Sequence, residues 1–344
     1  MGARPVWGEI LGKLLRREEL SGPEASAAMA AILSGEATSA QIAGFAVALR
    51  AKGETAGEMA ALASTMVAHG ERVEVDGPLL DTCGTGGDRS GSINVSTLAA
   101  LVAAGAGARV AKHGNRSATS ECGSADVLEA LGVAIELGPE GVARCIDEAG
   151  IGFCFAPRFH PALRHAGPAR RELGVPTTFN FLGPLANPAG VQHQVVGVAD
   201  PAMAELMIGT LARRGGERAW VVYGHDGLDE LTTTTTSTVW ELSGGQVRTF
   251  DVDPARYGLR APPPGALVGG GPAHNAAVVQ RVLGGEAGPQ RDLVVLNAAA
   301  ALLVAGVAGS VEEGLAAAAG AIDSGEASRR LGLLVATSNA AGEP

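Results

Sequence analysis

The sequence predicts an α/β domain preceded by a small all-helical domain, and two observations predict this order. Over the first seventy residues, a helix-start pattern of Ser or Thr followed three residues later by Glu or Gln recurs three times. From Pro78 onward, short apolar runs alternate with longer helical patterns, which is typical of a largely parallel sheet covered by helices. We therefore expect a helical N-terminal domain at 1–72 and an α/β domain at 73–344, with a helical crossover allowed near 170–190.

Each helix-start pattern of the N-terminal domain can form a capping box. In this arrangement the first side chain accepts from the backbone N–H three residues on, and the later side chain accepts from the first residue's own N–H. An Ala-, Leu- and Met-rich run follows each pattern, as a packed helix requires. The three boxes pair Ser21 with Glu24, Thr38 with Gln41, and Thr55 with Glu58.

The strands of the α/β domain are predicted from short apolar runs. A Thr-rich run at 232–238, continued by VWEL, predicts a later antiparallel strand, and the tail from Arg291 reads as helical again. The five earlier runs are LLDTC (79–83), ARVAKH (108–113), GFCFAP (152–157), HQVVGVAD (193–200) and RAWVVYG (218–224).

Composition excludes several classes of protein. Apolar residues make up 46% of the 344 positions and charged residues 18%, which indicates compact domains with a large core. The net charge of −10 argues against a general binder of nucleic acid or membrane surfaces, because such proteins carry basic fields. Four cysteines fit neither a disulfide framework nor a Cys-x-x-Cys metal pattern, and the N-terminus lacks a signal-peptide core. We expect reduced thiols in a cytoplasmic protein.

Two uncharged stretches, 90–108 and 293–311, approach the ~20 residues that span a bilayer. The first opens with polar residues and is broken by glycines, and the second contains Asn297. Buried helices explain both stretches better than membrane spans.

The most informative local motif is Asp81-Thr82-Cys83-Gly84-Thr85-Gly86-Gly87-Asp88, followed by Asn94-Val95-Ser96-Thr97 at a helix start. A glycine-rich turn between a strand and a helix lets backbone N–H groups approach an anion, and the helix dipole favours negative charge there. The lysine of a P-loop is absent and Arg89 replaces the third glycine of a dinucleotide-binding motif. The pattern therefore predicts a phosphate site that is neither a P-loop nor a dinucleotide-binding motif. A tight turn followed by helix-capping hydroxyls would give the same sequence pattern.

Two further polar segments follow predicted strands of the same sheet. Lys112-His113-Gly114-Asn115-Arg116-Ser117-Ala118-Thr119-Ser120 offers a point charge, a guanidinium fork and hydroxyls, which suit phosphate. Asp229 and Glu230 offer adjacent carboxylates, which suit Mg²⁺ bound to a ligand's phosphates, and Ser96 could add a hydroxyl. Because ligands bind at the carboxyl ends of strands in open α/β sheets, we expect the three segments to meet. Polar surface loops remain the alternative.

Together with GSAD (123–126), FHPA (159–162), FNFLGPLANP (179–188) and HDGLDE (225–230), these motifs resemble anthranilate phosphoribosyltransferases over nearly the whole chain. GTGGD alone is shared with pyrimidine nucleoside phosphorylases. The resemblance implies a two-domain architecture like that of nucleoside phosphorylases and phosphoribosyltransferases, in which the helical domain also forms a homodimer. It implies transfer of phosphoribosyl from 5-phosphoribosyl 1-pyrophosphate (PRPP) to the amine of anthranilate, a step of tryptophan biosynthesis. Two Mg²⁺ ions would assist.

The resemblance also implies the site. Ser96, Asp229 and Glu230 would ligate magnesium, and Gly84, Asn115 and Arg170 would face anthranilate, with His113 and His160 nearby. The sugar-pyrophosphate site would consist of Gly84, Gly87, Asp88, Ser92, Asn94, Val95, Ser96, Thr97, Lys112, His113, Gly114, Asn115, Arg116, Ser117, Ala118, Thr119, Ser120 and the segment Cys122-Gly123-Ser124.

Two of these assignments have alternatives, and one segment departs from the family pattern. Arg170 suits a substrate carboxylate because guanidinium pairs bidentately, but composition does not separate it from Arg171. His113 is as consistent with a loop histidine bonded to backbone as with substrate contact. Where many relatives have an arginine before the TxFN segment, this chain has Val175-Pro176-Thr177, so no functional charge is expected there.

Two competing functions remain. A nucleoside phosphorylase of the same fold would split nucleosides with inorganic phosphate and would not need the Asp229–Glu230 pair. A non-catalytic relative that binds nucleic acid would show a basic face and eroded metal ligands. The charge of −10 and the intact DGLDE motif argue against the second alternative.

Overall fold

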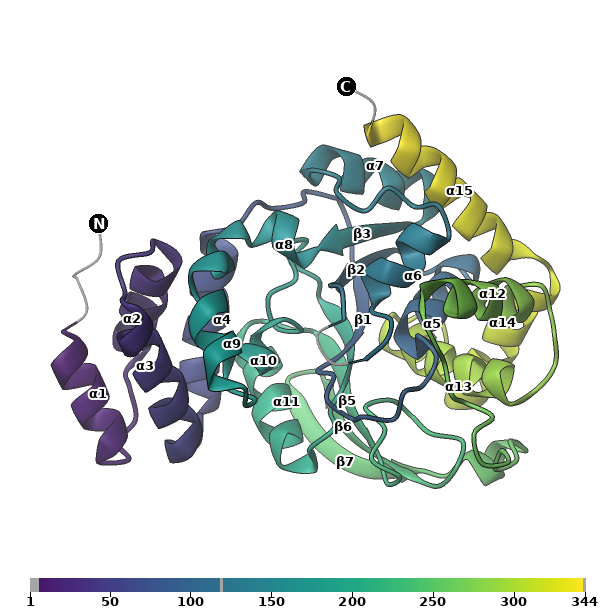
Figure 1. The fold of residues 1–344 in the computed structure, drawn as a ribbon. Coiled ribbons are helices and arrows are strands. Elements are labelled where there is room, and N and C mark those ends of the chain that lie inside the picture. Colours follow the sequence, from purple (N-terminus) through teal and green to yellow (C-terminus); the bar gives the residue numbers. More distant parts are fainter. Residues whose placement is uncertain (1–5, 118–119, 343–344) are drawn as a thin grey trace.

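The computed structural model describes residues 6–117 and 120–342 and contains a helical group beside an α/β body (Figure 1). Helices α1 to α4 form one end of the molecule, and a seven-stranded sheet forms the centre of the rest. The four N-terminal helices are α1 (Trp7–Leu15), α2 (Gly22–Leu33), α3 (Ser39–Lys52) and α4 (Ala56–Ala68). The predicted fold class is confirmed.

All three predicted capping boxes are present, at the starts of α2, α3 and α4. In the last of these, the Thr55 N–H donates to Glu58 Oε2 at 2.8 Å. Glu58 is only 1% exposed, and its other oxygen accepts from the Leu20 N–H at 2.9 Å while Lys52 Nζ lies 2.9 Å from Oε2. The same carboxylate therefore starts α4 and fastens two neighbouring segments to it.

The sheet has the order β3-β2-β1-β4-β5-β6-β7, with the first five strands parallel and the last two antiparallel. All five predicted parallel strands occur. The predicted Thr-rich strand begins only at Ser237, because Thr232 Oγ1 donates to Asp226 and the Thr232 N–H donates to Ser237 Oγ, which turns the chain instead. The strands are β1 (Leu80–Gly84), β2 (Val110–Gly114), β3 (Ile151–Phe155), β4 (His193–Gly197), β5 (Arg218–Gly224), β6 (Ser237–Ser243) and β7 (Gln246–Val252).

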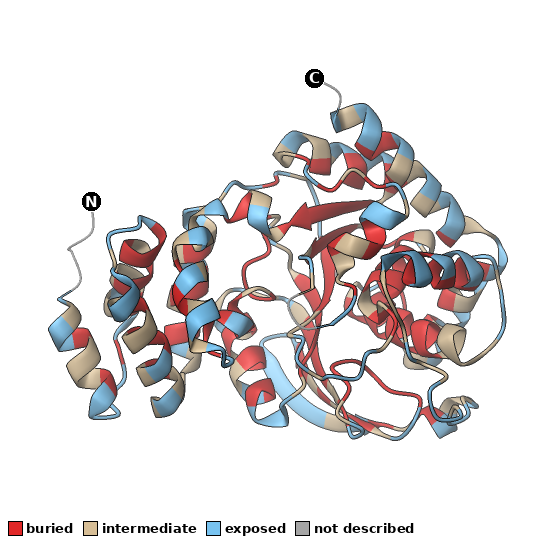
Figure 2. Ribbon diagram, viewed as in Figure 1, coloured by how far each residue is buried: buried red, intermediate tan, exposed pale blue. Residues whose placement is uncertain are grey.

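Alternating residues of the central strands divide the interior into two cores. Val195 of β4 and Trp220 of β5 belong to a core with the C-terminal helices, whereas Val196 and Val221 belong to a core with the N-terminal helices. This division follows from the period-two geometry of strands. Figure 2 shows the buried strands between the two helical layers.

The second core also contains residues from the predicted crossover region. Phe179, Leu182 and Leu185 pack in one core with side chains of α1 to α4, so the chain returns to the helical group after β3. The helices between β3 and β5 are α8 (Ala156–Phe159), α9 (Gly167–Leu173), α10 (Phe179–Leu182) and α11 (Ala204–Arg213).

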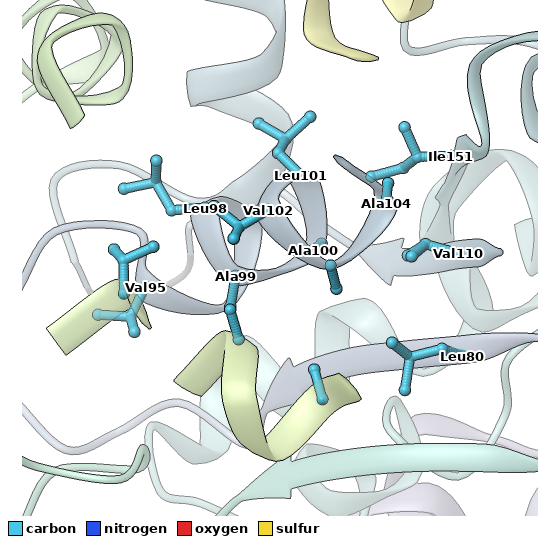
Figure 3. Close-up of a cluster of buried hydrophobic side chains, with 14 of the residues drawn as sticks. Leu80, Val95, Leu98, Ala99, Ala100, Leu101, Val102, Ala104, Val110 and Ile151 are labelled. Atoms are coloured by element: carbon cyan, nitrogen blue, oxygen red, sulfur yellow. The ribbon is translucent and has the colours of Figure 1, made fainter. Parts of the chain in front are cut away.

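On the other face, α5 (Val95–Gly105) lies against the sheet and is buried along its length, because it is covered by C-terminal helices (Figure 3). Its side chains pack with Leu80, Val110 and Ile151 of three adjacent strands. The remaining helices are α6 (Ser124–Ala130), α7 (Pro139–Ala149), α12 (Pro272–Leu283), α13 (Pro289–Val304), α14 (Val311–Asp323) and α15 (Glu326–Gly342).

The two uncharged stretches correspond to α5 and α13, which are both buried helices. No helix within the described ranges is long and apolar enough to cross a membrane. The four cysteines are buried and free in this structure.

Candidate active site

The glycine-rich loop runs from the end of β1 to the start of α5. Gly86 and Gly87 have φ angles of 69° and 87°, a backbone conformation that side chains with a Cβ rarely adopt. The turn that they allow directs the Gly86 N–H to Asp229 Oδ2 at 2.8 Å. The loop and the acidic segment, which are 143 residues apart in the sequence, are therefore in direct contact.

Asp229 lies in a space that two glycines leave open. A Cβ on Gly84 would collide with the Asp229 carboxylate, and a Cβ on Gly197 would collide with the Asp229 carbonyl group. These glycines end the neighbouring strands β1 and β4. The acidic segment therefore lies directly over the carboxyl ends of the two central strands, where ligands bind in open α/β sheets.

Asp229 and Glu230 are both only 9% exposed. Burial, together with the nearby carboxylate of Asp88, raises the pKa of Asp229 to about 6. Burial, followed by repulsion from Asp229, raises the pKa of Glu230 well above its usual range. A cation bound beside both carboxylates would favour their ionised forms and so oppose these upward pKa shifts.

Lys112 is the cation beside this pair. Its side chain is almost fully buried, and Nζ donates to the Thr82 carbonyl at 2.6 Å and lies 3.4 Å from Ser96 Oγ. The positive charge of Lys112 opposes the upward pKa shifts of Glu230 and of the buried Asp81. Lys112 therefore joins β2 to β1 and to the first turn of α5, and its charge acts on Glu230.

His113 follows Lys112 in β2, so its side chain lies on the opposite face of the strand, next to His160. The rings of His113 and His160 have centroids 5.4 Å apart, and each ring has one nitrogen bonded to a backbone carbonyl, of Gly183 and Ala186 respectively. Within the described part of the chain, His113 Nε2 has no hydrogen-bond partner. Burial lowers the pKa of His113 to about 3 and also lowers the pKa of His160, so both rings are neutral at pH 7.

The structure distinguishes Arg170 from Arg171. Arg170 is half-buried, with its guanidinium carbon 5.7 Å from the centroid of the Phe179 ring, whereas Arg171 is exposed. Burial lowers the pKa of Arg170, and no carboxylate among residues 6–117 and 120–342 pairs with it. A partly buried guanidinium without an acidic partner is suited to a ligand carboxylate.

Other predicted residues line the loop and the helix start. Asp88 and Ser92 are partly buried in the glycine-rich loop, and Val95 and Thr97 are buried in the first turn of α5. Thr97 Oγ1 has no partner in the described structure. Asn94 is the residue before α5, and its side chain bonds to Cys122 and Asn275.

The segment after β2 is less closely joined to this centre. Arg116 pairs with Asp126 at 3.0 Å and with Glu129 at 2.8 Å, so its guanidinium is directed to α6 in this structure. Ser117 Oγ donates to the Ser120 carbonyl at 2.6 Å. Gly114 is partly buried, Asn115 is exposed and its carbonyl accepts from Ser124 Oγ, and the predicted residues Ala118 and Thr119 lie outside the described residues.

Sequence reasoning missed several residues that hold the site. Asp81 accepts from the His113 N–H at 3.0 Å and from Asn187 Nδ2 at 2.8 Å, which fixes β1, β2 and the 179–188 segment together. Asn187 lies in the 179–188 motif that supports the family resemblance, but the sequence did not indicate that it bonds to Asp81. Gly197 had no local signal that set it apart, whereas Asn275 was expected only as a helix cap or a buried hydrogen-bonding group, and its buried bond to Asn94 confirms the second of these.

The donor set fits a hard divalent cation. Asp229 and Glu230 offer carboxylate oxygens, and Ser96 Oγ lies beside Lys112 at the same edge of the sheet. No cluster of three or more His, Cys, Asp or Glu side chains with metal-binding geometry occurs among the described residues. Few protein ligands and open positions are typical of Mg²⁺ sites in which substrate phosphates complete the coordination.

Comparison with known proteins agrees with this arrangement. The helical-bundle domain of the glycosyl transferase family matches residues 8–70, and the a/b domain of that family matches residues 76–328. An anthranilate phosphoribosyltransferase from Nocardioides sp. is 56% identical over 336 residues, covering 96% of this chain and 98% of the relative.

Solved structures agree as well. Anthranilate phosphoribosyltransferase from Thermus thermophilus matches with a TM-score of 0.90 and 45% identity over 96% of this chain and 99% of that one. The Saccharomyces cerevisiae enzyme in complex with PRPP and Mg matches with a TM-score of 0.90 and 29% identity, covering 97% and 98% of the two chains. The yeast enzyme with 4-fluoroanthranilate gives a TM-score of 0.88 at 28% identity over the same shares.

These matches extend over nearly the full length of both chains, and they include both domains and the loops at the carboxyl ends of the strands. The chain belongs to the anthranilate phosphoribosyltransferase family, a family of glycosyltransferase enzymes.

Proposed function

We propose that the protein transfers the phosphoribosyl group of PRPP to the amine of anthranilate, giving N-(5-phosphoribosyl)anthranilate and pyrophosphate. This reaction is a step of tryptophan biosynthesis. The contact between the Gly86 N–H and the buried Asp229 carboxylate is the observation that carries the proposal, because it joins a loop suited to phosphate to a pair of carboxylates suited to a metal ion. Neither the phosphorolysis nor the nucleic-acid alternative is favoured by the family relationship.

The sugar pyrophosphate is proposed to bind along the glycine-rich loop and the first turn of α5. Exposed N–H groups of the loop and the positive end of the helix dipole favour the negative charge of phosphates. The predicted residues from Gly84 to Thr97 would line this position, and those at 112–117 and 120–124 would form its second wall. Arg116 would exchange its ion pairs with α6 for phosphate oxygens if it takes part.

Magnesium is proposed to be held by Asp229, Glu230 and the hydroxyl of Ser96, with two ions bound when PRPP is present. Supporting this, the yeast relative was solved with PRPP and Mg. When bound, the metal neutralises charge that develops on the pyrophosphate as it leaves. Lys112 contributes fixed positive charge beside the same carboxylates.

Anthranilate is proposed to bind between Gly84, Asn115 and Arg170, with His113 and His160 nearby. Arg170 offers its unpaired guanidinium to the substrate carboxylate, and the neutral imidazole of His113 offers one free nitrogen. The yeast relative with 4-fluoroanthranilate supports a site for this class of aromatic acid.

In the chemical step, the bond from C1′ to the pyrophosphate oxygen breaks and a bond from the amine nitrogen to C1′ forms. The aromatic amine is neutral at pH 7, so alignment with C1′ matters more than deprotonation before attack. One proton leaves the nitrogen afterwards. The protein's contribution is to hold the two substrates in line and to exclude water from the reacting carbon.

The direct test is loss of anthranilate fluorescence on mixing the purified protein with PRPP and Mg²⁺. We expect turnover only when all three are present, and none when EDTA removes the metal. Phosphorolysis of nucleosides by inorganic phosphate, without consumption of anthranilate, would overturn the proposal.

We also propose that the protein is a cytoplasmic homodimer formed through its helical domain, for which we retain the bounds 1–72. Leu15 of α1 and Val47 of α3 are 78% and 44% exposed on two helices that pack together, so a second copy could cover them. Sedimentation of the purified protein tests the oligomeric state, and a monomer at micromolar concentration would contradict it.

A further inference from the structure

A short segment from the C-terminal part of the chain crosses the end of the glycine-rich loop. This segment, residues 267–275, is called the brace below. Its backbone pairs with the loop in antiparallel fashion, because the Ile93 N–H donates to the Leu267 carbonyl at 3.1 Å and the Gly269 N–H donates to the Gly91 carbonyl at 2.8 Å. The brace ends in the first turn of α12.

The contact is too close for a side chain at Gly269. A Cβ there would lie 2.9 Å from the Ser92 carbonyl oxygen and 2.8 Å from Asn275 Oδ1. These distances are shorter than van der Waals contact allows, so the brace and the loop are packed backbone to backbone.

Asn275 joins the two segments through its side chain. It is only 2% exposed, its Oδ1 accepts from the Gly270 N–H at 2.8 Å, and its Nδ2 donates to Asn94 Oδ1 at 2.8 Å. Asn94 Nδ2 in turn donates to the Cys122 carbonyl at 3.0 Å. A chain of amide hydrogen bonds therefore connects the brace, the start of α5 and the segment before α6.

Both polar atoms of the Asn94 side chain form hydrogen bonds within the protein, Oδ1 with Asn275 and Nδ2 with Cys122. Its side chain is thereby held in one orientation before any substrate arrives, and the loop that precedes it is anchored at its far end. The near end of the loop is anchored by Gly86 on Asp229. Ordering a loop of this length on binding would otherwise cost conformational entropy and weaken affinity.

We propose that Asn275 is a positioning residue for the sugar pyrophosphate: acting through Asn94, it holds the glycine-rich loop and the start of α5 in the conformation that binds this substrate. The inference rests on the proposed function, and it assigns a task to a helix that contributes none of the predicted ligand-binding residues. Asn275 itself touches no reacting atom.

The first test is Asn275→Ala. Because a buried amide that bridges two segments loses two hydrogen bonds, we expect the KM for PRPP to rise about tenfold. The KM for anthranilate should be unchanged and kcat should change less than about threefold. Asn275→Asp keeps an acceptor for the Gly270 N–H but faces Asn94 Oδ1 with a second oxygen, so it should raise the same KM.

A matched control is Ser338→Ala in α15. Ser338 is also fully buried and accepts from the Ala134 N–H at 3.1 Å, remote in sequence from both loops. This variant should lose stability without raising the KM for PRPP. An equal rise in both variants would mean that general destabilisation explains the effect, and the inference would be overturned.

A double-mutant cycle tests whether Asn275 acts through Asn94. If it does, the protein with both Asn94→Ala and Asn275→Ala should have the PRPP KM of Asn94→Ala alone, because the second change removes nothing further. Additive effects would show that Asn275 acts independently, which contradicts the proposal.

Amide hydrogen exchange tests the proposal without measuring enzyme activity, and it does not require that the alanine variant folds. In the wild-type protein, PRPP with Mg²⁺ should slow exchange of the brace amides at least about threefold, although no predicted ligand contact lies there. In substrate-free Asn275→Asp protein, amides 91–95 should exchange faster than in wild type.

The outcomes separate the two claims. If wild-type protein consumes no anthranilate with PRPP, the proposed function fails, while exchange at 91–95 still tests the brace. If wild-type protein saturates normally with PRPP and Asn275→Ala has an unchanged KM, the positioning role fails and the proposed function stands.

Discussion

Gly84 and Gly197 are direct partners across the parallel strands β1 and β4, and both lie against Asp229. One leaves room for the carboxylate and the other for the main chain of the same residue. The acidic segment could not lie this close to the strand ends if either position carried a side chain. Two positions far apart in the sequence therefore create one space.

Gly84→Ala is expected to displace the Asp229 carboxylate and break its bond to the Gly86 N–H. Activity at saturating Mg²⁺ should fall at least about a hundredfold, which corresponds to about 3 kcal/mol of lost transition-state stabilisation. Steady-state kinetics measure this. Gly320→Ala in α14, where a Cβ meets nothing within 4 Å, is the control and should keep full activity.

The acidic pair is expected to be required for metal binding but not for folding. Asp229→Asn with Glu230→Gln should abolish most turnover and eliminate heat of Mg²⁺ binding in the presence of PRPP. Without metal, the double variant should unfold at a temperature no lower than that of wild type. Burial raises the pKa of both carboxylates, so their charged forms are unfavourable in the folded protein, and neutral amides remove this cost. Full activity of this variant would refute the metal assignment.

Arg170→Ala is expected to raise the KM for anthranilate about 10- to 100-fold, as the loss of a charge-assisted hydrogen bond does. The KM for PRPP should change little. Arg171→Ala is a matched control, because the neighbouring side chain is exposed on the same helix. If both variants behave alike, Arg170 does not contact the substrate.

His113 is expected to make stability depend on pH. Its folded pKa of about 3 lies below the unfolded value of roughly 6.5, so on acidification the unfolded chain takes up a proton that the folded chain refuses. The stabilising contribution is therefore complete above about pH 6.5 and is lost as the pH falls toward about 3. Urea unfolding at about pH 7 and about pH 5 should show a smaller fall for His113→Asn, by about 2 kcal/mol.

A capping box offers a test of the helical domain alone. Thr38→Ala removes the acceptor that the Gln41 N–H uses at 3.2 Å and should lower the free energy of unfolding by about 1 kcal/mol. The PRPP and anthranilate KM values should be unchanged. A large kinetic effect would mean that α3 is coupled to the site more tightly than its position indicates.

Local patterns were predicted well because they depend on neighbours in the chain. The capping boxes at Ser21, Thr38 and Thr55 each involve two residues three positions apart. The strands from β1 to β5 are largely buried on both faces, so they are continuous apolar runs that stand out from the helical patterns.

Elements at the edge were harder to predict. The strand β7 was missed because it pairs only with β6, and its side chains are mostly exposed and carry no apolar pattern. The start of β6 was misplaced because threonine has high strand propensity, while hydrogen bonds from Thr232 to Asp226 and Ser237 favour a turn there.

The sequence by itself determined the domain order, the helix starts, the parallel strands and the motifs that carry the family relationship, since each is a property of contiguous residues. Only the tertiary structure decided that Arg170 and not Arg171 is half-buried without an acidic partner among the described residues, that Lys112 lies buried beside Ser96, and that Arg116 is directed to α6. Burial and contact depend on segments that are distant in the chain. The local hydrophobic pattern therefore does not show which of two neighbouring arginines is packed against such a segment. The same reason explains why the partner that Asn275 bonds in the loop, Asn94, is known only from the folded structure.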